Sequence, residues 1–208
     1  PWEDVFATID PSPLAAGTIG QVHRATLVSG DRVVVKVQRP NAAGEIEQDL
    51  TLLQAFAEQV ARRPVLRQVI DVEAVFKQLA ESLRRELDFF QEASNIERMR
   101  EVIAAYDRLG VPAVHRDLST SRLLVMQEIP GTPISQAPEG RARKEAARQL
   151  LESYYRQVVS EGFFHADPHP GNLMWWQDRI YFLDFGMVGI LSAELREHLM
   201  WLLSAFWR

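Results

Sequence analysis

The 208-residue chain contains no cysteine, which excludes disulfides and thiolate metal sites. It also has no uninterrupted run of about 18 apolar residues, so it shows neither a membrane span nor a signal peptide. Its 23 basic residues do not cluster and are outnumbered by 28 acidic ones, giving a net charge of −5, which argues against a nucleic-acid surface. The first residue is proline, and the last lie inside an apolar helical pattern, so we expect a domain excised from a longer protein.

The residues that are present have the composition of an ordinary globular domain, with 47% hydrophobic and 25% charged residues. A chain of this length can bury one good core or two small lobes. Periodicity and turn signals predict an α+β protein, with a break at Pro130-Gly131-Thr132-Pro133 that separates residues 1–130 from residues 131–208. The predicted strands are 21–28, 32–38, 111–114, 123–129, 173–176 and 180–183, and the predicted helices are 40–64, 71–110 (with apolar residues Phe76, Leu79, Leu83, Leu87 and Phe90), 141–161 and 194 onward.

The most informative stretch is His165-Ala166-Asp167-Pro168-His169-Pro170-Gly171-Asn172, followed by Asp184-Phe185-Gly186. Asp167 stands five residues before Asn172, and Asn172 stands twelve before Asp184, which is the order and spacing of a kinase catalytic loop and its metal-binding Asp-Phe-Gly. Asp167 would orient or deprotonate the attacking hydroxyl or water. Asn172 and Asp184 would hold one or two magnesium ions against nucleotide phosphates.

The polar residues also fit two other motifs. The His-x-Asp-x-His pattern from His165 to His169 is an alternative site for zinc or iron, but the oxygen ligands of Asn172 and Asp184 favour a hard cation such as Mg²⁺, with His165 bracing the loop. The string His115-Arg116-Asp117-Leu118 is a closer literal match to the kinase motif. It lacks the Asn at the required spacing and any Asp-Phe-Gly at the right distance, so Arg116 and Asp117 are predicted to be solvated loop residues.

The phosphate-binding end is predicted at Ala15-Ala16-Gly17-Thr18-Ile19-Gly20-Gln21-Val22, which fits a glycine-rich loop at its second and third glycines. Gly17 and Gly20 would let backbone N–H groups approach phosphate oxygens, and Val22 would cover the adenine. The alternative is an ordinary glycine-containing turn, because short glycine motifs are weak evidence. On the strand before the break, Met126 would precede the adenine-binding segment, with backbone groups of Gln127 and Ile129 facing the base.

A lysine inside a run of valines, Lys36, shares a strand face with Val34 and Gln38 and is predicted to grip the α and β phosphates. A water-facing lysine on an edge strand is the alternative. Such a phosphate-binding lysine needs a carboxylate, and Glu92 has no basic residue at helical spacing, so we predict a Lys36–Glu92 pair. Glu86 also lacks a cation on its own helix and is equally available.

Together these motifs resemble the UbiB family of atypical kinases, the aarF-domain-containing kinases. The resemblance rests on the alanine-rich loop 13–23, the Glu-x-Asp element at Glu86 and Asp88 with Glu92 after it, residues 119–120 with 124–126, the loop 164–172 and the segment 183–186. It implies a bilobal protein-kinase-like fold, with a small β-rich N-lobe carrying inserted helices and a reduced helical C-lobe. It also implies ATP or ADP binding with Mg²⁺, ATPase rather than protein-kinase behaviour, and a role in ubiquinone or other isoprenoid-lipid metabolism at a membrane, on its cytoplasmic face in bacteria.

Three features qualify the resemblance. The family's Lys-x-Gly-Gln element, whose partner would be Glu86, is absent, and Gly17 stands where the family usually has alanine, which bears on any preference for ADP over ATP. Only residues 187–191 separate the Asp-Phe-Gly from the last helix, too few for an activation segment that docks a peptide. A small-molecule kinase of the choline or aminoglycoside type and a nucleotide-binding pseudokinase remain as alternatives.

The predicted site therefore comprises several groups of residues. The catalytic residues are Asp167, Lys36, Glu92, Asn172 and Asp184; the nucleotide-binding residues are Ala15, Ala16, Gly17, Thr18, Ile19, Gly20, Val22, Lys36, Met126, Gln127 and Ile129; the metal ligands are Asn172 and Asp184; and the regulatory element of the family is Glu86 and Asp88. The predicted partners are a nucleotide and a lipid or quinone-pathway component, with no nucleic acid, and membrane association through segments outside this chain.

Overall fold

The structure is a computed structural model that describes residues 2–61 and 71–206. They form two compact units, one comprising Pro1–Gln91 with Asp117–Val125 and the other comprising Glu92–Arg116 with Met126–Arg208. This grouping differs from the predicted division at residues 130/131. The reason is that helix α4 (Phe89–Val102) is hydrogen-bonded to Phe185, so a segment early in the sequence packs with the C-terminal part.

The first unit is built on a sheet in which β3 and the valine-rich strand β4 are central. Its strand order is β1-β3-β4-β6, with β2 paired to β3. Alternate residues of the β3–β4 hairpin face the core, where Val33 and Val35 are 0% and 2% exposed and pack with Phe6 and Leu27. The hairpin turn places Gly30 at φ 92°, a conformation that favours glycine. The strands are β1 (Phe6–Ile9), β2 (Ala15–Ala16), β3 (Gly20–Leu27), β4 (Arg32–Gln38) and β6 (Leu123–Gln127).

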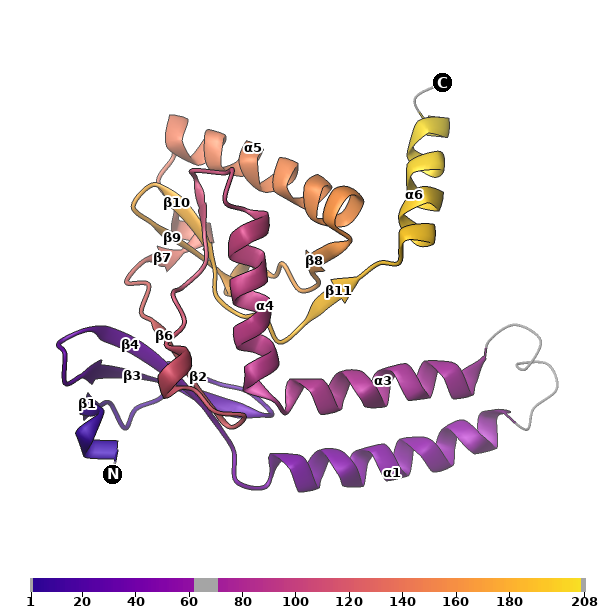
Figure 1. Ribbon diagram of the computed structural model, residues 1–208, viewed down its shortest axis with the longest axis horizontal. Coiled ribbons are helices and arrows are strands. Elements are labelled where there is room, and N and C mark those ends of the chain that lie inside the picture. Colours follow the sequence, from indigo (N-terminus) through magenta and orange to yellow (C-terminus); the bar gives the residue numbers. More distant parts are fainter. Residues whose placement is uncertain (1, 62–70, 207–208) are drawn as a thin grey trace. The chain divides into compact units, whose positions relative to one another are not determined.

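Two helices of the same unit, α1 (Ala42–Ala61) and α3 (Val72–Glu86), lie side by side (Figure 1). Ile46, Leu50 and Ala80 are buried between them. The predicted start of α1 near residue 40 is confirmed, whereas its predicted end near 63–64 lies outside the described residues. Most of the predicted apolar stripe also packs here, but Leu79 and Phe90 are 44% and 38% exposed.

The predicted continuous helix over 71–110 is wrong. Helix α3 ends at Glu86, α4 begins at Phe89, and α4 ends at Val102. The Asp88 carboxylate accepts a hydrogen bond from Phe90 N at 3.0 Å, and Phe89 N donates to Ser121 O at 2.9 Å. Asp88 therefore caps the start of a new helix, and a distant carbonyl stabilises the break.

The second unit contains a sheet of strand order β5-β10-β9-β7 and a separate β8–β11 pair. The predicted strands at 173–176 and 180–183 are confirmed to within a residue as β9 (Leu173–Trp176) and β10 (Arg179–Phe182). The predicted strand at 111–114 is wrong, because that segment contributes only a single bridge between Val114 and Met126. The other strands are β5 (Leu109–Gly110), β7 (Thr132–Pro133), β8 (Phe163–His165) and β11 (Val188–Ile190).

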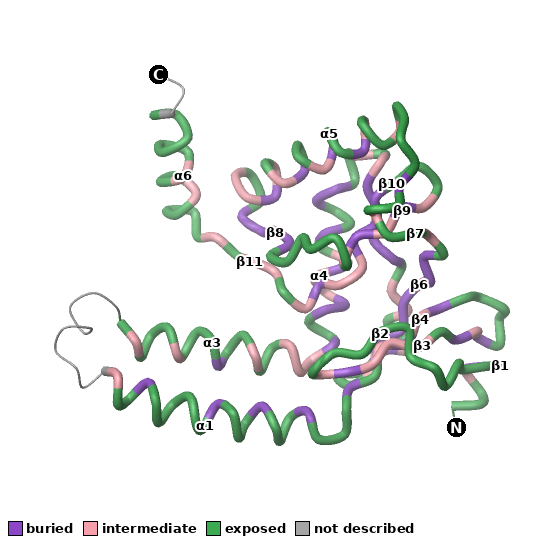
Figure 2. Tube along the Cα trace, turned by 180° about the vertical axis from the view of Figure 1, so that it is seen from behind, coloured by how far each residue is buried: buried purple, intermediate pink, exposed green. Residues whose placement is uncertain are grey.

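The predicted helix over 141–161 is confirmed as two parts, α5 (Arg141–Tyr155) and a π-helix, η4 (Arg156–Glu161). The last helix, α6, spans Ala193–Phe206. Short 3₁₀ helices are η1 (Trp2–Asp4), η2 (Arg116–Leu118), η3 (Ile134–Gln136) and η5 (Pro170–Asn172). Along the chain, buried residues gather on the strands and on α4, while most residues of α1, α3 and α6 are exposed or half-buried (Figure 2). Over residues 2–61 and 71–206, no helix combines the length and apolarity needed to cross a bilayer.

Candidate functional site

The polar loop after β8 begins at a buried histidine. His165 is 1% exposed; its backbone N–H donates to Gln157 Oε1 at 3.0 Å, and its Nδ1 accepts from Asp167 N at 3.2 Å. Its ring lies 5.0 Å from that of Phe185 and 5.5 Å from that of Phe182. The histidine therefore braces the loop from within the core, as the sequence predicted.

The loop closes on itself through Asn172. The Asn172 side-chain amide donates from Nδ2 to Asp167 O at 3.1 Å and to Asp167 Oδ2 at 2.9 Å. At the tip of the loop, Gly171 N donates to His169 Nδ1 at 3.0 Å. These bonds bring two of the predicted catalytic residues, Asp167 and Asn172, into direct contact.

The β9–β10 hairpin places Asn172 and Asp184 at the same end of the sheet. Leu173 pairs with Phe182 in the antiparallel register, and one step beyond, Leu183 N donates to Asn172 O at 2.9 Å. Asp184 follows directly, and its Oδ1 accepts from Gly186 N at 2.9 Å. The twelve-residue separation in sequence is therefore closed by a hairpin, as the spacing of the motif requires.

Helix α4 contacts the segment around Phe185 through two side chains. Glu92, only 3% exposed, accepts from Phe185 N at 3.3 Å, and Asn95 Nδ2 donates to Phe185 O at 3.0 Å. Asn95 was not among the predicted site residues. Its signal was its place three residues after Glu92, which puts the two side chains on one helical face. The Lys36–Glu92 pair stays a prediction.

In the first unit, the glycine-rich segment is a short strand followed by a tight turn. Ala15 pairs with Val22 and Ala16 with Gln21, while Gly17 N donates to Gly20 O at 2.9 Å. A Cβ on Gly20 would lie 2.6 Å from Val37 O, whereas one on Gly17 would meet only Gly20 O at 4.0 Å. Gly20 is thus explained by backbone packing, and only Gly17 leaves open space beside its backbone.

Lys36 lies directly opposite Val22 in the β3–β4 register, so the two side chains share one face of the sheet. Its ammonium group lies 5.5 Å from the centroid of the Phe89 ring. Gln38, further along the same face, is 7% exposed and donates to Leu87 O at 2.9 Å while accepting from Arg122 Nε at 3.1 Å. The predicted shared face of Lys36 and Gln38 is confirmed by this register.

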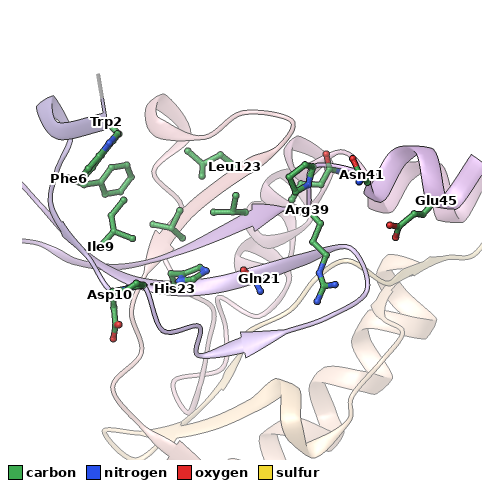
Figure 3. A pocket seen from close by; sticks show the side chains of 15 residues that line it. Trp2, Phe6, Ile9, Asp10, Gln21, His23, Arg39, Asn41, Glu45 and Leu123 are labelled. Atoms are coloured by element: carbon green, nitrogen blue, oxygen red, sulfur yellow. Dashed lines mark hydrogen bonds between the residues drawn. The ribbon is translucent and has the colours of Figure 1, made fainter.

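A cavity of about 770 Å³ lies beside this sheet (Figure 3). Gln21, His23, Val35 and Val37 line it, and Gln38 at the end of β4 lines it as well. Neither Lys36 nor any other predicted site residue is in its lining, so the cavity does not coincide with the predicted nucleotide site.

Some backbone groups of the residues predicted to lie beside adenine form hydrogen bonds within the second unit. Gln127 N donates to Ala113 O at 2.7 Å, and Ile129 O accepts from Gly131 N at 2.8 Å. Met126 and Ile129 are 6% and 8% exposed. These two bonds occupy the Gln127 N–H and the Ile129 carbonyl, so a contact with adenine would use other groups of these residues.

The string His115-Arg116-Asp117-Leu118 has a structural role that the sequence prediction missed. Arg116 is not merely solvated: it forms an ion pair with Glu97 of α4 at 3.0 Å and donates to Ser94 Oγ at 2.7 Å. Asp117 is exposed, as predicted. Through Arg116, the loop that contains this string is bound to helix α4.

Burial and charge perturb two titratable groups near Asp167. Burial lowers the pKa of His165 below 6.5, and nearby Asp184 and Asp167 oppose this shift only in part. Burial, with a smaller contribution from the Asp167 charge, raises the pKa of Tyr154 to about 12. Both side chains are therefore neutral at neutral pH.

The side-chain oxygens of Asn172 and Asp184, at one end of the β9–β10 hairpin, suit a hard cation. With Asn172 Nδ2 engaged by Asp167, Oδ1 is the atom of that amide able to ligate a metal, and Asp184 supplies a carboxylate. Over residues 2–61 and 71–206, no three His, Cys, Asp or Glu side chains gather as a metal cluster, so the structure does not assemble the zinc or iron alternative. Two protein ligands are typical of Mg²⁺ completed by phosphates and water.

Known proteins match both the sequence and the fold. The family model of the ABC1 atypical kinase-like domain matches residues 1–208. The chloroplastic protein ACTIVITY OF BC1 COMPLEX KINASE 8 of Arabidopsis thaliana is 37% identical, covering 95% of this chain and 27% of that protein. The probable protein kinase UbiB of Pseudomonas entomophila is 34% identical, covering 99% of this chain and 40% of that protein.

Two solved structures are similar in fold. The complex of Rv3197 with erythromycin from Mycobacterium tuberculosis has a TM-score of 0.68 at 30% identity and covers 91% of this chain and 48% of that one. The Rio2 kinase–ADP/Mg²⁺–phosphoaspartate complex from Chaetomium thermophilum has a TM-score of 0.51 at 15% identity, covers 94% of this chain and 52% of that one, and shows the fold alone.

The predicted α+β, kinase-like fold and the predicted family are both confirmed by these comparisons. The chain spans 27% and 40% of the two curated relatives named above. On its sequence match over the full length and its kinase-like fold, this chain belongs to the ABC1 atypical kinase-like family, whose members include the UbiB kinases.

Proposed function

We propose that this domain binds a magnesium nucleotide, ATP or ADP, and transfers the terminal phosphoryl group of ATP to water or to a small acceptor. The observation that carries the proposal is the double hydrogen bond from Asn172 to Asp167, together with the hairpin that brings Asp184 to the same end of the sheet. Kinase chemistry depends mainly on positioning and electrostatic stabilisation, and this arrangement supplies both.

Each residue has a distinct proposed task. Asp167 accepts the proton of the attacking hydroxyl or orients it, and Asn172 fixes the Asp167 carboxylate in one direction through a 2.9 Å bond. Asn172 Oδ1 and Asp184 would hold Mg²⁺, which neutralises charge on the phosphates. Neutral His165 keeps Asp167 N in place, since its Nδ1 accepts that hydrogen bond.

On the nucleotide side, Gly17 leaves room for phosphate oxygens beside its backbone, and the half-buried Lys36 presents a cation on the same strand face as Val22. A neighbour in fold, Rio2, was crystallised with ADP and Mg²⁺, which supports this assignment. The Glu86 and Asp88 element is proposed as regulatory; in this chain Asp88 caps helix α4.

The acceptor is proposed to be water or a small or lipid-like molecule rather than a protein. Only Met187 separates Gly186 from strand β11, and helix α6 begins at Ala193, so the connection offers no long segment on which a peptide could dock. By family, we propose that the whole protein acts in ubiquinone or other isoprenoid-lipid metabolism at a membrane, through segments beyond this chain.

A titration with a fluorescent ATP analogue, with and without Mg²⁺, combined with a phosphate-release assay, tests the proposal. The Asp184→Asn variant is expected to lose Mg²⁺-dependent binding, because it removes the ligand charge. Asp178→Asn is the matched control, since Asp178 lies in the turn at the other end of the same hairpin and Asn tolerates its φ of 59°. Unchanged affinity in Asp184→Asn would contradict the metal assignment, and Mg²⁺-dependent binding without phosphate release would indicate a pseudokinase.

A further inference from the structure

The π-helix η4 holds the catalytic loop through one buried side chain, Gln157. Gln157 and Ser153 are both 0% exposed, an unusual environment for a glutamine. Its Oε1 accepts from His165 N at 3.0 Å, and its Nε2 donates to Ser153 Oγ at 3.4 Å. The Gln157 carboxamide therefore uses both its oxygen and its nitrogen inside the core.

The backbone carbonyl of Gln157 also accepts a hydrogen bond from the segment that leads into β8. The N–H of Gly162 donates to Gln157 O, five residues back, which is the bond that defines a π-turn. Gly162 has φ 60°, which turns the chain sharply into strand β8. Gln157 thus contacts the following segment twice, through its carbonyl at Gly162 and through its side chain at His165.

Regular helical spacing directs Gln157 inward. It follows Gln149 and Ser153 at intervals of four residues, which places the three buried side chains on one face of the helix. The π-turn, of a kind that occurs frequently at functional sites, then ends at Gly162 and leads into strand β8, which packs against η4. His165 N of that strand thereby meets the Gln157 carboxamide.

From Gln157 a short series of bonds leads to the reacting groups. Gln157 fixes His165 N, His165 Nδ1 accepts from Asp167 N, and Asp167 accepts twice from Asn172. We propose that Gln157, presented by the π-helix, is a positioning residue that sets the geometry of Asp167 in the loop. This inference rests on the proposed function, since it assigns Gln157 to the phosphoryl-transfer step.

The test compares Gln157→Met with Gln149→Met. Gln149 is a matched control because it is also a buried glutamine on the same helical run, yet it bonds to Arg108 N and Asp107, away from the loop. Hydrogen exchange of the peptide 163–172 is followed by mass spectrometry, with the peptide 173–182 as internal reference. Nucleotide affinity and phosphate release are measured on the same samples.

Gln157→Met is expected to speed exchange in 163–172 about tenfold and to slow phosphate release about tenfold, with nucleotide affinity within about twofold of wild type. Gln149→Met is expected to leave all three unchanged. If Gln157→Met does not fold, Gln157→Asn, whose amide is one methylene too short to reach His165 N, carries the same expectation.

Wild-type exchange in 163–172 in a folded Gln157 variant, or equal acceleration in Gln149→Met, would overturn the inference. Accelerated exchange with unchanged phosphate release would also overturn it, because the loop geometry would then not matter to the reaction. A wild-type protein that neither binds magnesium nucleotide nor releases phosphate would instead refute the proposed function, while the exchange result would still report whether Gln157 holds the loop.

Discussion

The side-chain amide of Asn172 donates to both the backbone carbonyl and the carboxylate of Asp167, at 3.1 Å and 2.9 Å. One residue thereby fixes the direction of the Asp167 carboxylate and keeps its own Oδ1 for another ligand. The five-residue spacing of the two side chains is therefore a property of the closed loop and not only a sequence pattern.

Replacing the Asp167 carboxylate should separate binding from turnover. Asp167→Asn is expected to retain nucleotide affinity within about threefold while lowering phosphate release by about 10² to 10⁴, because the general base is lost. Stopped-flow phosphate release and equilibrium nucleotide titration measure the two quantities. The control is Asp117→Asn in the literal His-Arg-Asp string, which should change neither; full residual turnover in Asp167→Asn would argue against its catalytic role.

The predicted pair of Lys36 and Glu92 is testable by a double-mutant cycle. If the two act together on the nucleotide, Lys36→Met and Glu92→Gln should each weaken nucleotide binding. The loss of binding free energy in the double variant should then be much smaller than the sum of the losses in the two single variants. Isothermal titration measures the nucleotide affinity of the wild type, the two single variants and the double variant. Additive losses would reject the pair; the bond from Phe185 N to Glu92 does not depend on it.

The two glycines of the 15–20 segment should behave differently. Gly20→Ala is expected to lower the free energy of unfolding by about 1–3 kcal/mol, because its Cβ would lie 2.6 Å from Val37 O. Gly17→Ala, whose Cβ has open space, should leave the unfolding free energy within about 0.5 kcal/mol and instead change the relative affinity for ATP and ADP. Urea unfolding and nucleotide titration distinguish the two effects, and equal destabilisation by both substitutions would contradict the description of this turn.

Stability should fall in mild acid because of His165. Its pKa is lowered in the folded state from 6.5, chiefly by burial, so the unfolded chain binds the proton more readily. The stabilisation of the folded state that depends on neutral His165 is fully present above pH 6.5. It is lost as the pH falls below 6.5 towards the pKa of His165 in the folded state. Urea unfolding between pH 8 and pH 5 is expected to show this loss in wild type and in a control, His198→Asn at an exposed site, but to show less of it in His165→Asn.

Much of the local structure followed from the sequence. The run of valines around Lys36 predicted a strand on which Lys36, Val34 and Gln38 share a face, and the strand β4 with its register to β3 confirms it. The polar loop, the β9–β10 hairpin and the helix over 141–161 were also located within a few residues. These features depend on contacts between residues close in the chain, whose spacing the sequence displays directly.

The contacts that organise the site are long-range, and periodicity did not reveal them. The helix break at Asp88 is stabilised by the carbonyl of Ser121, and Asn95 of α4 reaches the carbonyl of Phe185. Arg116 is exposed, as predicted, and it also forms an ion pair with Glu97. In each case the partner lies many residues away.

The sequence was sufficient to propose Asp167, Asn172 and Asp184 as reacting groups, because their spacing is that of a kinase loop and hairpin. The contacts that hold these residues depend on the fold. Gln157 meets His165 because strand β8 packs against η4, and Glu92 meets Phe185 because α4 packs beside that segment. A buried polar group must find a partner wherever the fold brings one, and the identity of that partner depends on the path of the whole chain.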